Sequence, residues 1–323
     1  AARTLTERLG VPIVSSLSGE DGFIERLPEP YRTEARHELR TRCADLAALV
    51  APSEYYAGFM AEYLAVPRER ITVIRPGLDL DGHAAPGSPA QSELLPEESE
   101  EIEPSSDELP DERLSEDEVD TIVAEQEPLP PEQKPITIGY LSRVCPTKGL
   151  HQLVEAFRLL LREPAMPPMR LRAAGHLGRD DRVYFRQIRR QLSRFGLTDR
   201  FEYVGELRRA EKIAFLQSLD ILSVPATRPE SKGLAVLEAL ANGTPAVLPD
   251  HGVFSELIAE TSGGLVHEPN RPSALAVALE RMIRNPALVE RCGREGQEAI
   301  RRDYDVRRTA ERMVEFYGTV CKK

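Results

Sequence analysis

The feature that most constrains the fold is an alternation in which a short apolar run is followed by a loop and then by a helix-forming segment. In the second half of the chain these runs are 136–141, 171–174, 201–204, 220–224, 245–248 and 263–266. Strands that alternate with helices are typical of βαβ units, whose strands pair in parallel. The chain is therefore predicted to be an α/β protein with doubly wound parallel sheets, which bind ligands beyond the carboxyl ends of their strands.

The first 83 residues follow the same alternation with fewer strands. Strands are predicted at 11–16, 46–51 and 71–75, with helices at about 29–43 and 54–64 between them. These elements make only about half of a doubly wound sheet. We therefore expect the native chain to carry further N-terminal residues that complete this first sheet.

Acidity is confined to one segment of the chain. The formal net charge is −11, yet residues 91–132 hold 17 acidic residues and one arginine, a local −16 that leaves +5 for the rest. The stretch 84–134 is also rich in Pro and Ser and poor in aromatic residues, so it cannot bury enough apolar surface to order itself. We expect a disordered acidic linker or insertion there.

The remaining composition is that of an ordinary soluble globular protein. Hydrophobic residues make up 41% of the chain, and no apolar run approaches the roughly 20 residues that a membrane-spanning helix needs. The sequence has no signal-like start, so a cytoplasmic location is expected. The cysteines form no C-x2-C pair and are expected to be reduced thiols that bind no metal: Cys43, Cys145, Cys292 and Cys321.

One segment of the second half places a carboxylate where an apolar residue is expected. After the predicted strand 220–224, two prolines precede a helix over about 233–242. Leu234, Leu237 and Ala241 form an apolar stripe on that helix, and Glu238 takes the i+4 position of the same stripe. Glu238 therefore needs a hydrogen-bond donor, which either a ligand or an arginine of the protein would supply.

The residues ahead of this helix suit a phosphate. Lys232 and the free amides of Gly233 and Leu234 lie at the helix start, where the helix dipole favours an anion. Glu230 precedes them, so one short segment presents a phosphate site with Glu230 on one side and Glu238 on the other.

The spacing Glu-x7-Glu before Ala-Asn-Gly-Thr-Pro resembles the donor-site signature of retaining glycosyltransferases of the GT-B type, which have two Rossmann-like domains, and specifically glycosyltransferase family 4. The resemblance is close over 135–317 and looser over 1–83. It implies that Glu230 contacts the donor sugar, that Glu238 holds the nucleotide ribose, and that the helix-start amides bind the diphosphate. A carboxylate suits the ribose diol because its two oxygens can accept from neighbouring hydroxyls.

Two cations of the second half match the same donor site. Arg143 and Lys148 flank the loop after the strand 136–141, where they can hold an anion. In the resembled family such a pair neutralises the leaving diphosphate. Taken alone, the pair could equally be two solvated surface cations.

Glycines stand at the ends of the next two predicted strands, where a residue without a side chain lets the backbone approach a ligand closely. Gly175 is followed by His176, which could reach the donor or could be a packing or surface residue. The family binds its nucleotide base near the positions of Gly205 and Leu207.

On the acceptor side, the loop after the strand 11–16 is predicted to face the cleft between the two domains. Many relatives carry a histidine in this loop, and Ser18 stands near its position. Asp21 or Glu20 could orient an acceptor hydroxyl in its place, whereas the alternative is a turn in which Asp21 caps the next segment. Asp21 is therefore a candidate catalytic residue.

The predicted organisation has four parts. Residues 1–83 are a partial Rossmann-like acceptor domain, 84–134 the linker, and 135–303 a Rossmann-like donor domain. Residues 304–323 are a C-terminal helix that, in the resembled family, returns toward the first domain.

Two predicted helices carry charged residues whose partners the sequence does not identify. Glu256 opens the helix that follows the strand 245–248 and is expected to cap it. The helix at about 181–195 carries a basic face that the segment 91–132 could reach, although a solvated face is the simpler interpretation. The arginines of that face are Arg182, Arg186, Arg189 and Arg190.

The resemblance implies the transfer of a sugar from a nucleotide-sugar to a hydroxyl of a carbohydrate or lipid-linked acceptor, with retention of configuration. Arg143 and Lys148 would stabilise the leaving charge, so no metal or other cofactor is expected, and the acceptor proton would pass to the departing phosphate. No nucleic-acid partner is expected, and peripheral contact with a membrane is allowed.

Two other classes of function compete with this interpretation. A nucleotide-sugar-binding module would keep the donor residues but lack a working acceptor side, which the short first domain would explain. A nicotinamide dehydrogenase is disfavoured because no strand is followed by G-x-G-x-x-G.

Overall fold

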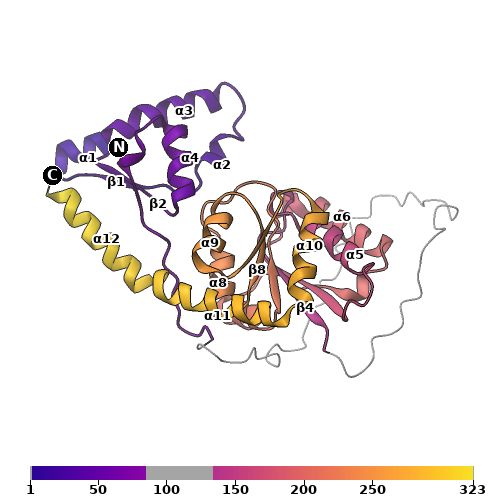
Figure 1. The fold of residues 1–323 in the computed structure, drawn as a ribbon. Helices are drawn as coiled ribbons and strands as arrows, with labels where there is room; N and C mark the ends of the chain where they lie inside the picture. The colour runs from indigo at the N-terminus through magenta and orange to yellow at the C-terminus, as the bar shows by residue number, and fades with distance from the viewer. Residues whose placement is uncertain (1, 85–133, 323) are drawn as a thin grey trace.

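The computed structural model describes residues 2–84 and 134–322, which form two units of parallel sheet and helices (Figure 1). The α/β fold class predicted from the alternation is confirmed. Most of the predicted acidic linker lies in 85–133, outside the described residues. No helix of the described part is both long and apolar enough to cross a membrane.

The second unit is built on a six-stranded parallel sheet with the order β6-β5-β4-β7-β8-β9. Its strands are β4 (Ile136–Leu141), β5 (Met169–Ala174), β6 (Phe201–Tyr203), β7 (Ile221–Ser223), β8 (Ala246–Pro249) and β9 (Gly264–His267). The chain winds outward from β4 to β6 and then returns to β7 on the other side of β4. At such a reversal, doubly wound sheets bind ligands in the crevice beyond the carboxyl ends of the two strands, which here are β4 and β7.

Helices cover both faces of this sheet. On one face α5 packs against α6 and α10, and on the other α8 packs against α7 and α11, which also contacts α9. The helices are α5 (Leu150–Leu160), α6 (Arg182–Arg194), α7 (Arg209–Gln217), α8 (Leu234–Ala241), α9 (Val253–Thr261), α10 (Pro272–Ile283) and α11 (Pro286–Asp303). The core lies between these layers because both faces of each central strand are apolar.

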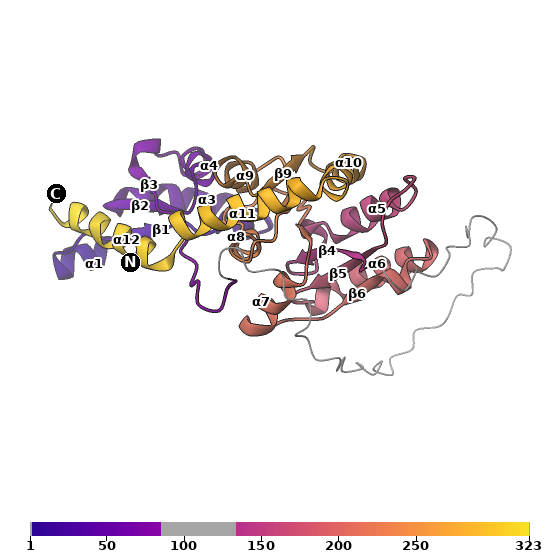
Figure 2. The ribbon, with the colours of Figure 1, turned by 60° about the horizontal axis from the view of Figure 1, so that its bottom comes forward.

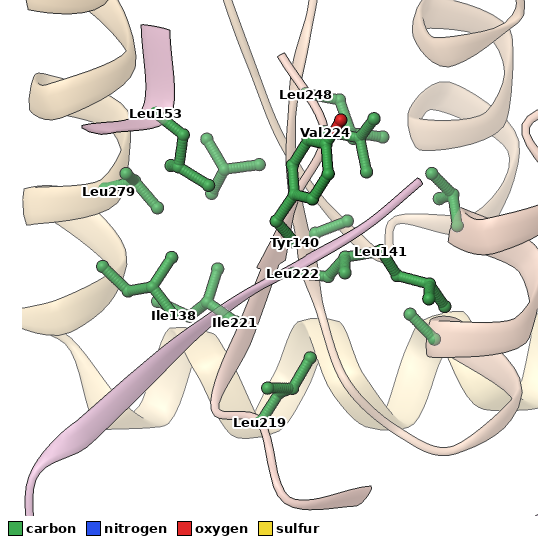
Figure 3. Packing of buried hydrophobic residues seen from close by; sticks show 14 of the residues in the cluster. Ile138, Tyr140, Leu141, Leu153, Leu219, Ile221, Leu222, Val224, Leu248 and Leu279 are labelled. Atoms are coloured by element: carbon green, nitrogen blue, oxygen red, sulfur yellow. The ribbon is translucent and has the colours of Figure 1, made fainter. Parts of the chain in front are cut away.

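Figure 3 shows this core around β4 and β7. Ile138 and Leu153 of the α5 face are fully buried, as is Leu222 of β7. Tyr140 is also fully buried, and its hydroxyl donates to the carbonyl of Arg143 at 3.0 Å. That bond ties the loop after β4 to the core beneath it.

The first unit holds a smaller parallel sheet with the order β1-β2-β3. Its elements are α1 (Ala2–Leu9), β1 (Val14–Ser16), α2 (Asp21–Ile24), α3 (Tyr31–Arg42), β2 (Ala48–Ala51), α4 (Glu54–Leu64) and β3 (Ile71–Val73). Among the described helices of this unit, only α4 contributes several buried side chains, including Tyr56 and Met60, which pack with Leu49 of β2. Neither α1 nor α3 buries a residue, so the core of this unit is thin.

The last helix, α12 (Val306–Cys321), extends from α11 to the first unit, and Figure 2 shows the two helices as a band along both units. The segment leading out of the first unit is held by this band. Leu78 donates its N–H to the carbonyl of Tyr304 at 2.7 Å and accepts from the N–H of Val306 at 3.1 Å. The two units are therefore joined by backbone pairing as well as by side chains.

The same segment ends in a hydrogen-bonded cluster beside α8. Asn242 donates to the Nδ1 atom of His83 at 2.9 Å, and its Oδ1 atom accepts from the N–H of Ala84 at 3.2 Å. His83 must stay neutral to accept this bond at Nδ1. Burial lowers the pKa of His83, and the charges of Arg209, Arg301 and Lys212 lower it further.

This arrangement predicts a pH-dependent stability. The folded-state pKa of His83 lies below its ordinary value of 6.5, so the unfolded chain binds more protons in the window below pH 6.5. The contribution of neutral His83 is present above pH 6.5 and lost as the pH falls through that window. We expect H83Q, which keeps a neutral acceptor, to lose less unfolding free energy than the parent protein between about pH 7 and about pH 5.5 in urea titrations.

His37→Gln, in exposed α3, is the matched control and should behave as the parent. An equal loss of stability in H83Q and in the parent would show that His83 does not carry this pH dependence.

Candidate functional site

The loops after β4 and β7 are in direct backbone contact at the reversal of the sheet. A Cβ atom on Gly149 would lie 1.8 Å from the carbonyl oxygen of Pro225, and the φ of Gly149 is +76°. The N–H of Thr227 donates to the carbonyl of Thr147 at 2.9 Å. Only glycine fits at Gly149, so the two loops that carry the predicted cations and Glu230 are fixed against each other.

Lys148 and Glu230 form an ion pair across these two loops. The Nζ atom of Lys148 lies 2.5 Å from Oε1 of Glu230, and the two side chains are 21% and 24% exposed. Arg143 is exposed on the same loop, and its side chain forms no ion pair with any residue of 2–84 or 134–322. The pair therefore remains accessible, and Arg143 is available to an anion beside it.

The start of α9 holds the backbone of Glu230. The N–H of Val253 donates to the carbonyl of Glu230 at 2.9 Å. A Cβ atom on Gly252 would lie 2.6 Å from the nitrogen of Glu230, so the residue before α9 has to be glycine. Two backbone contacts thus set the position of this carboxylate.

The start of α8 offers amide donors next to Glu230. Gly233 precedes the helix with a φ of +64°, and the N–H groups of Gly233 and Leu234 have no hydrogen-bond partner among the described residues. Lys232, one residue earlier, is partly buried. The first amides of a helix have no partner within it, so these two groups can donate to an anion, and the anion site stays a prediction.

The apolar stripe predicted on α8 is buried at two of its three positions. Leu237 and Ala241 are fully buried, whereas Leu234 at the helix start is 48% exposed. Val236 and Leu240 are buried as well, so the core face of α8 is wider than the stripe. The side chain of Glu238 is 16% exposed, so most of it is removed from solvent.

The partner of Glu238 is a lysine rather than the arginine that the sequence suggested. The Nζ atom of Lys212 lies 2.5 Å from Oε1 of Glu238. Lys212 comes from α7, a helix that was not predicted from the sequence. The sequence signal for the start of this helix is Arg-x-x-Glu, in which Glu211 accepts from the N–H of Arg208 at 2.7 Å. This pattern is harder to recognise than a capping box that begins with a hydroxyl residue.

The strand-end glycines have two different roles. A Cβ atom on Gly175 would lie 2.0 Å from the carbonyl of Ser142, so this glycine admits the neighbouring loop and not a ligand. At Gly205, with a φ of +78°, a Cβ atom would meet no described atom within 4 Å, and the turn itself requires glycine. Nearby, His176 pairs with Glu206 at 2.8 Å, and both side chains are mostly exposed.

Leu207 packs against the core of the second unit while remaining partly exposed. An apolar side chain in that position beyond β6 can form one wall for a planar ring.

On the acceptor side, Asp21 is held by a buried tyrosine. The hydroxyl of Tyr56 donates to Oδ1 of Asp21 at 2.5 Å, and the Tyr56 side chain is 2% exposed. Burial, together with the bond to Asp21, raises the pKa of Tyr56 well above its usual range, so the phenol keeps its proton. Asp21 is therefore oriented through one oxygen and has the second available.

The two units meet beside the donor loop. Ser53 donates its hydroxyl to the carbonyl of Ser231 at 3.2 Å, and a Cβ atom on Gly19 would lie 3.7 Å from the Ser231 hydroxyl. Ser231 follows Glu230 directly, and Gly19 lies two residues before Asp21. The fold thus brings the loop that carries Asp21 against the loop that carries Glu230.

Glu256 caps a helix of the other unit, and not its own helix as the sequence suggested. Its two carboxylate oxygens accept from the N–H groups of Glu54 and Tyr55, the first residues of α4, at 3.1 and 2.9 Å. Ser53 satisfies the third amide of α4, that of Tyr56, at 3.1 Å. The negative charge favours the positive end of the α4 dipole, so this contact holds the first unit against α9.

Comparison with known proteins identifies the family of this chain. Residues 123–299, more than half of the chain, match the family model described as "Glycosyl transferases group 1". The chain belongs to this family. The match includes both loops of the crevice, α8 and Lys212.

Curated relatives of this group 1 chain act on different acceptors according to their names. A phosphatidyl-myo-inositol mannosyltransferase of Mycobacterium leprae is 34% identical over 135 residues, which are 42% of this chain and 35% of the relative. A 2-deoxystreptamine glucosyltransferase of Streptomyces kanamyceticus is 28% identical over 202 residues, 60% of this chain and 48% of the relative. The chain thus spans about a third to a half of the length of these relatives.

Solved structures of low sequence identity share the fold. HepE of Anabaena, solved in complex with UDP and glucose, superposes with a TM-score of 0.73 at 19% identity, covering 98% of this chain and 74% of that one. Sucrose-phosphate synthase of Thermosynechococcus elongatus gives 0.70 at 18% identity, covering 95% and 67%. The group 1 chain therefore has an α/β architecture similar to that of GT-B glycosyltransferases, with a small first unit of three strands.

The cross-unit cap predicts that Glu256 stabilises the contact between the units. Glu256→Gln removes the charge and replaces one acceptor by an amide group that cannot accept from α4. We expect a loss of about 1 kcal/mol at this contact, the typical value of a helix cap, and faster hydrogen exchange at Glu54 and Tyr55.

The matched control is Glu290→Gln, which removes an equal charge from an exposed site on α11. Unchanged exchange in α4 of E256Q, or an equal change in E290Q, would contradict the assigned role of Glu256.

Proposed function

We propose that this group 1 family member transfers a sugar from a nucleotide-sugar to an acceptor hydroxyl, with retention of configuration and without a metal, in the manner of glycosyltransferase family 4. The observation that carries the proposal is the convergence of Lys148, Glu230 and the α8 amides at the reversal of the sheet. Family membership supports the reaction class, and HepE, solved with UDP and glucose, supports a donor of that type.

In the proposed donor complex, positive groups receive the diphosphate. Arg143, Lys148 and the free amides at Gly233 and Leu234 supply charge and donors where the leaving group becomes negative. Preorganised groups of this kind usually make the largest single contribution to such a reaction. These groups would stabilise the negative charge of the leaving group without a metal ion, which is the basis for proposing a metal-independent reaction.

The two glutamates have separate proposed roles. Glu238 accepts hydrogen bonds from the ribose hydroxyls, and Glu230 contacts the donor sugar. In the described chain each carboxylate is paired with a lysine, Lys212 or Lys148. These lysines orient the carboxylates before the donor binds, so little reorganisation is required on binding.

The remaining predicted donor contacts are proposed at the far side of the crevice. Leu207 and the turn at Gly205 would receive the nucleotide base, because this turn is open and is bordered by an apolar side chain. Gly175 would contribute indirectly, because its lack of a side chain lets the loop at Ser142 lie close to it. His176 and its partner Glu206 are exposed, so His176 would lie at the edge of the donor site.

On the acceptor side, we propose that Asp21 orients the hydroxyl of a carbohydrate or lipid-linked acceptor. Tyr56 holds one of its oxygens, and the contact of Gly19 with Ser231 brings this loop to the donor loop. The acceptor proton would pass to the departing phosphate. The proposed location is the cytoplasm, which suits a protein whose four cysteines are all free thiols.

A nucleotide-sugar-binding module remains the second candidate. It is favoured by the thin core of the first unit, in which α1 and α3 bury no side chain. Such a module would bind the donor in the same crevice without holding an acceptor hydroxyl near it.

Product analysis separates the two candidates. The chain is incubated with UDP- and GDP-linked sugars and a panel of glycoside and polyprenyl or phosphatidylinositol acceptors, and products are examined by mass spectrometry and by NMR of the anomeric proton. A new glycosidic bond with the donor's anomeric configuration supports retaining transfer. Inverted product contradicts retention, and donor binding with no product on any acceptor supports the binding module.

The ribose contact generates a further prediction. Glu238→Gln should weaken binding of the donor nucleotide by about 1.5–3 kcal/mol, the range for a hydrogen bond to a charged group. Calorimetry with UDP and GDP measures the change, and E290Q, altered far from the crevice, should bind as the parent does. An E238Q variant that stays folded and keeps full affinity would remove Glu238 from the site.

A further inference from the structure

The outer side of α6 carries a cluster of arginines that no described acidic residue neutralises. The helix turns Ile188 and Leu192 into the core and presents its opposite side to solvent. None of these arginines forms an ion pair or a side-chain hydrogen bond within 2–84 and 134–322. We call this surface the α6 basic face, and it consists of Arg182, Arg186, Arg189, Arg190 and Arg194.

The arrangement is unfavourable for an isolated helix. Arg182, Arg186, Arg190 and Arg194 follow one another at i,i+4 spacing, and like charges at that spacing destabilise a helix. The helix contains no Asp or Glu to offset this repulsion. Elsewhere in the second unit, Arg158 of α5 pairs with Glu155 of its own helix. An anionic partner on the α6 basic face would therefore gain the attraction and also relieve the repulsion.

We propose that the partner of the α6 basic face is the acidic segment 91–132 of the same chain. This segment carries 17 acidic residues and one arginine, whereas the rest of the chain has a net charge of only +5. Arginine forks match carboxylates in paired hydrogen bonds, so a segment rich in Glu and Asp complements this face. The proposal concerns only charge complementarity and is independent of the proposed sugar transfer.

The covalent connection favours this partner over a separate anion. The segment is joined at both ends to the unit that contains α6: Ala84 is held by Asn242, and Lys134 lies two residues before the start of β4. The 49 residues of 85–133 can extend to about 160 Å at roughly 3.3 Å per residue, more than the unit requires. Tethering makes the contact intramolecular, so a free polyanion would have to compete with a high local concentration of the segment.

The contact should be screened by salt and should keep other polyanions from α6. Charges that meet near a protein surface attract each other much less when the Debye length falls from about 20 Å to about 4 Å. While the segment occupies the α6 basic face, an anionic lipid surface cannot use the same arginines. The segment would thus limit the surfaces to which this unit binds.

Energy transfer within the full chain tests the proposal. Dyes are attached to Ser115→Cys and Thr198→Cys in a Cys321→Ser background, since Cys321 is the exposed thiol and the other three are buried. Transfer efficiency should fall at least about twofold as NaCl rises from about 20 mM to about 500 mM. R182Q/R186Q/R190Q/R194Q should show the low efficiency at every salt concentration.

The matched control changes the same charge at exposed arginines whose side chains make no bond to a described residue. It is R162Q/R281Q/R294Q/R307Q, which should keep the salt-dependent transfer of the parent. Circular dichroism checks that all variants unfold at similar temperatures. Efficiency that does not depend on salt, or that is equal in the two quadruple variants, would overturn the proposal.

A second measurement distinguishes the segment from a lipid surface. Vesicles of phosphatidylcholine with about 30% phosphatidylserine are sedimented with the parent and with a full-length chain whose 17 acidic residues in 91–132 are changed to Gln or Asn. We expect the neutralised chain to bind several-fold more vesicle than the parent. This binding should be lost when Arg182, Arg186, Arg190 and Arg194 are also changed to Gln. If the parent and the neutralised chain bind the vesicles equally, and both lose this binding when the arginines are changed, the face binds lipid and the proposal is contradicted.

Discussion

The start of α9 is the structural element on which the relation between the two units depends. Its first amide holds the carbonyl of Glu230, and one turn later Glu256 accepts from the first amides of α4. Because both contacts come from a single helical turn, Glu230 and α4 move together with α9. The Lys148–Glu230 pair and the contact of Ser53 with Ser231 then follow from the same placement.

The sheet of the second unit could be predicted because its strands are apolar on both faces and are bounded by glycine and proline. The strand 136–141 and the helix 54–64 have the predicted bounds, and the other strands shift by a few residues. The first unit was less predictable. The strand expected at 11–16 is only Val14–Ser16, and α1 was not expected at all.

Within the site, local patterns located residues but did not identify their partners. Loops at the carboxyl ends of neighbouring strands must converge, so the proximity of Lys148 and Glu230 follows from the strand order. The partners of Glu238 and Glu256 lie 26 and about 200 residues away along the chain. Periodicity assigns a side chain to one face of its own helix, and it carries no information on which distant element meets that face. For that reason the cap on α4 and Lys212 were missed.

The backbone pairing of Leu78 with Tyr304 and Val306 has a consequence for biosynthesis. Leu78 is nearly buried, and both its N–H and its carbonyl are satisfied only by residues more than 220 positions later in the chain. Until the ribosome has released those residues, the segment that leaves the first unit has two unpaired polar groups and no α12 beside it. The first unit to emerge is thus the last to be completed, and a chain truncated before α12 would expose this segment to chaperones and proteases.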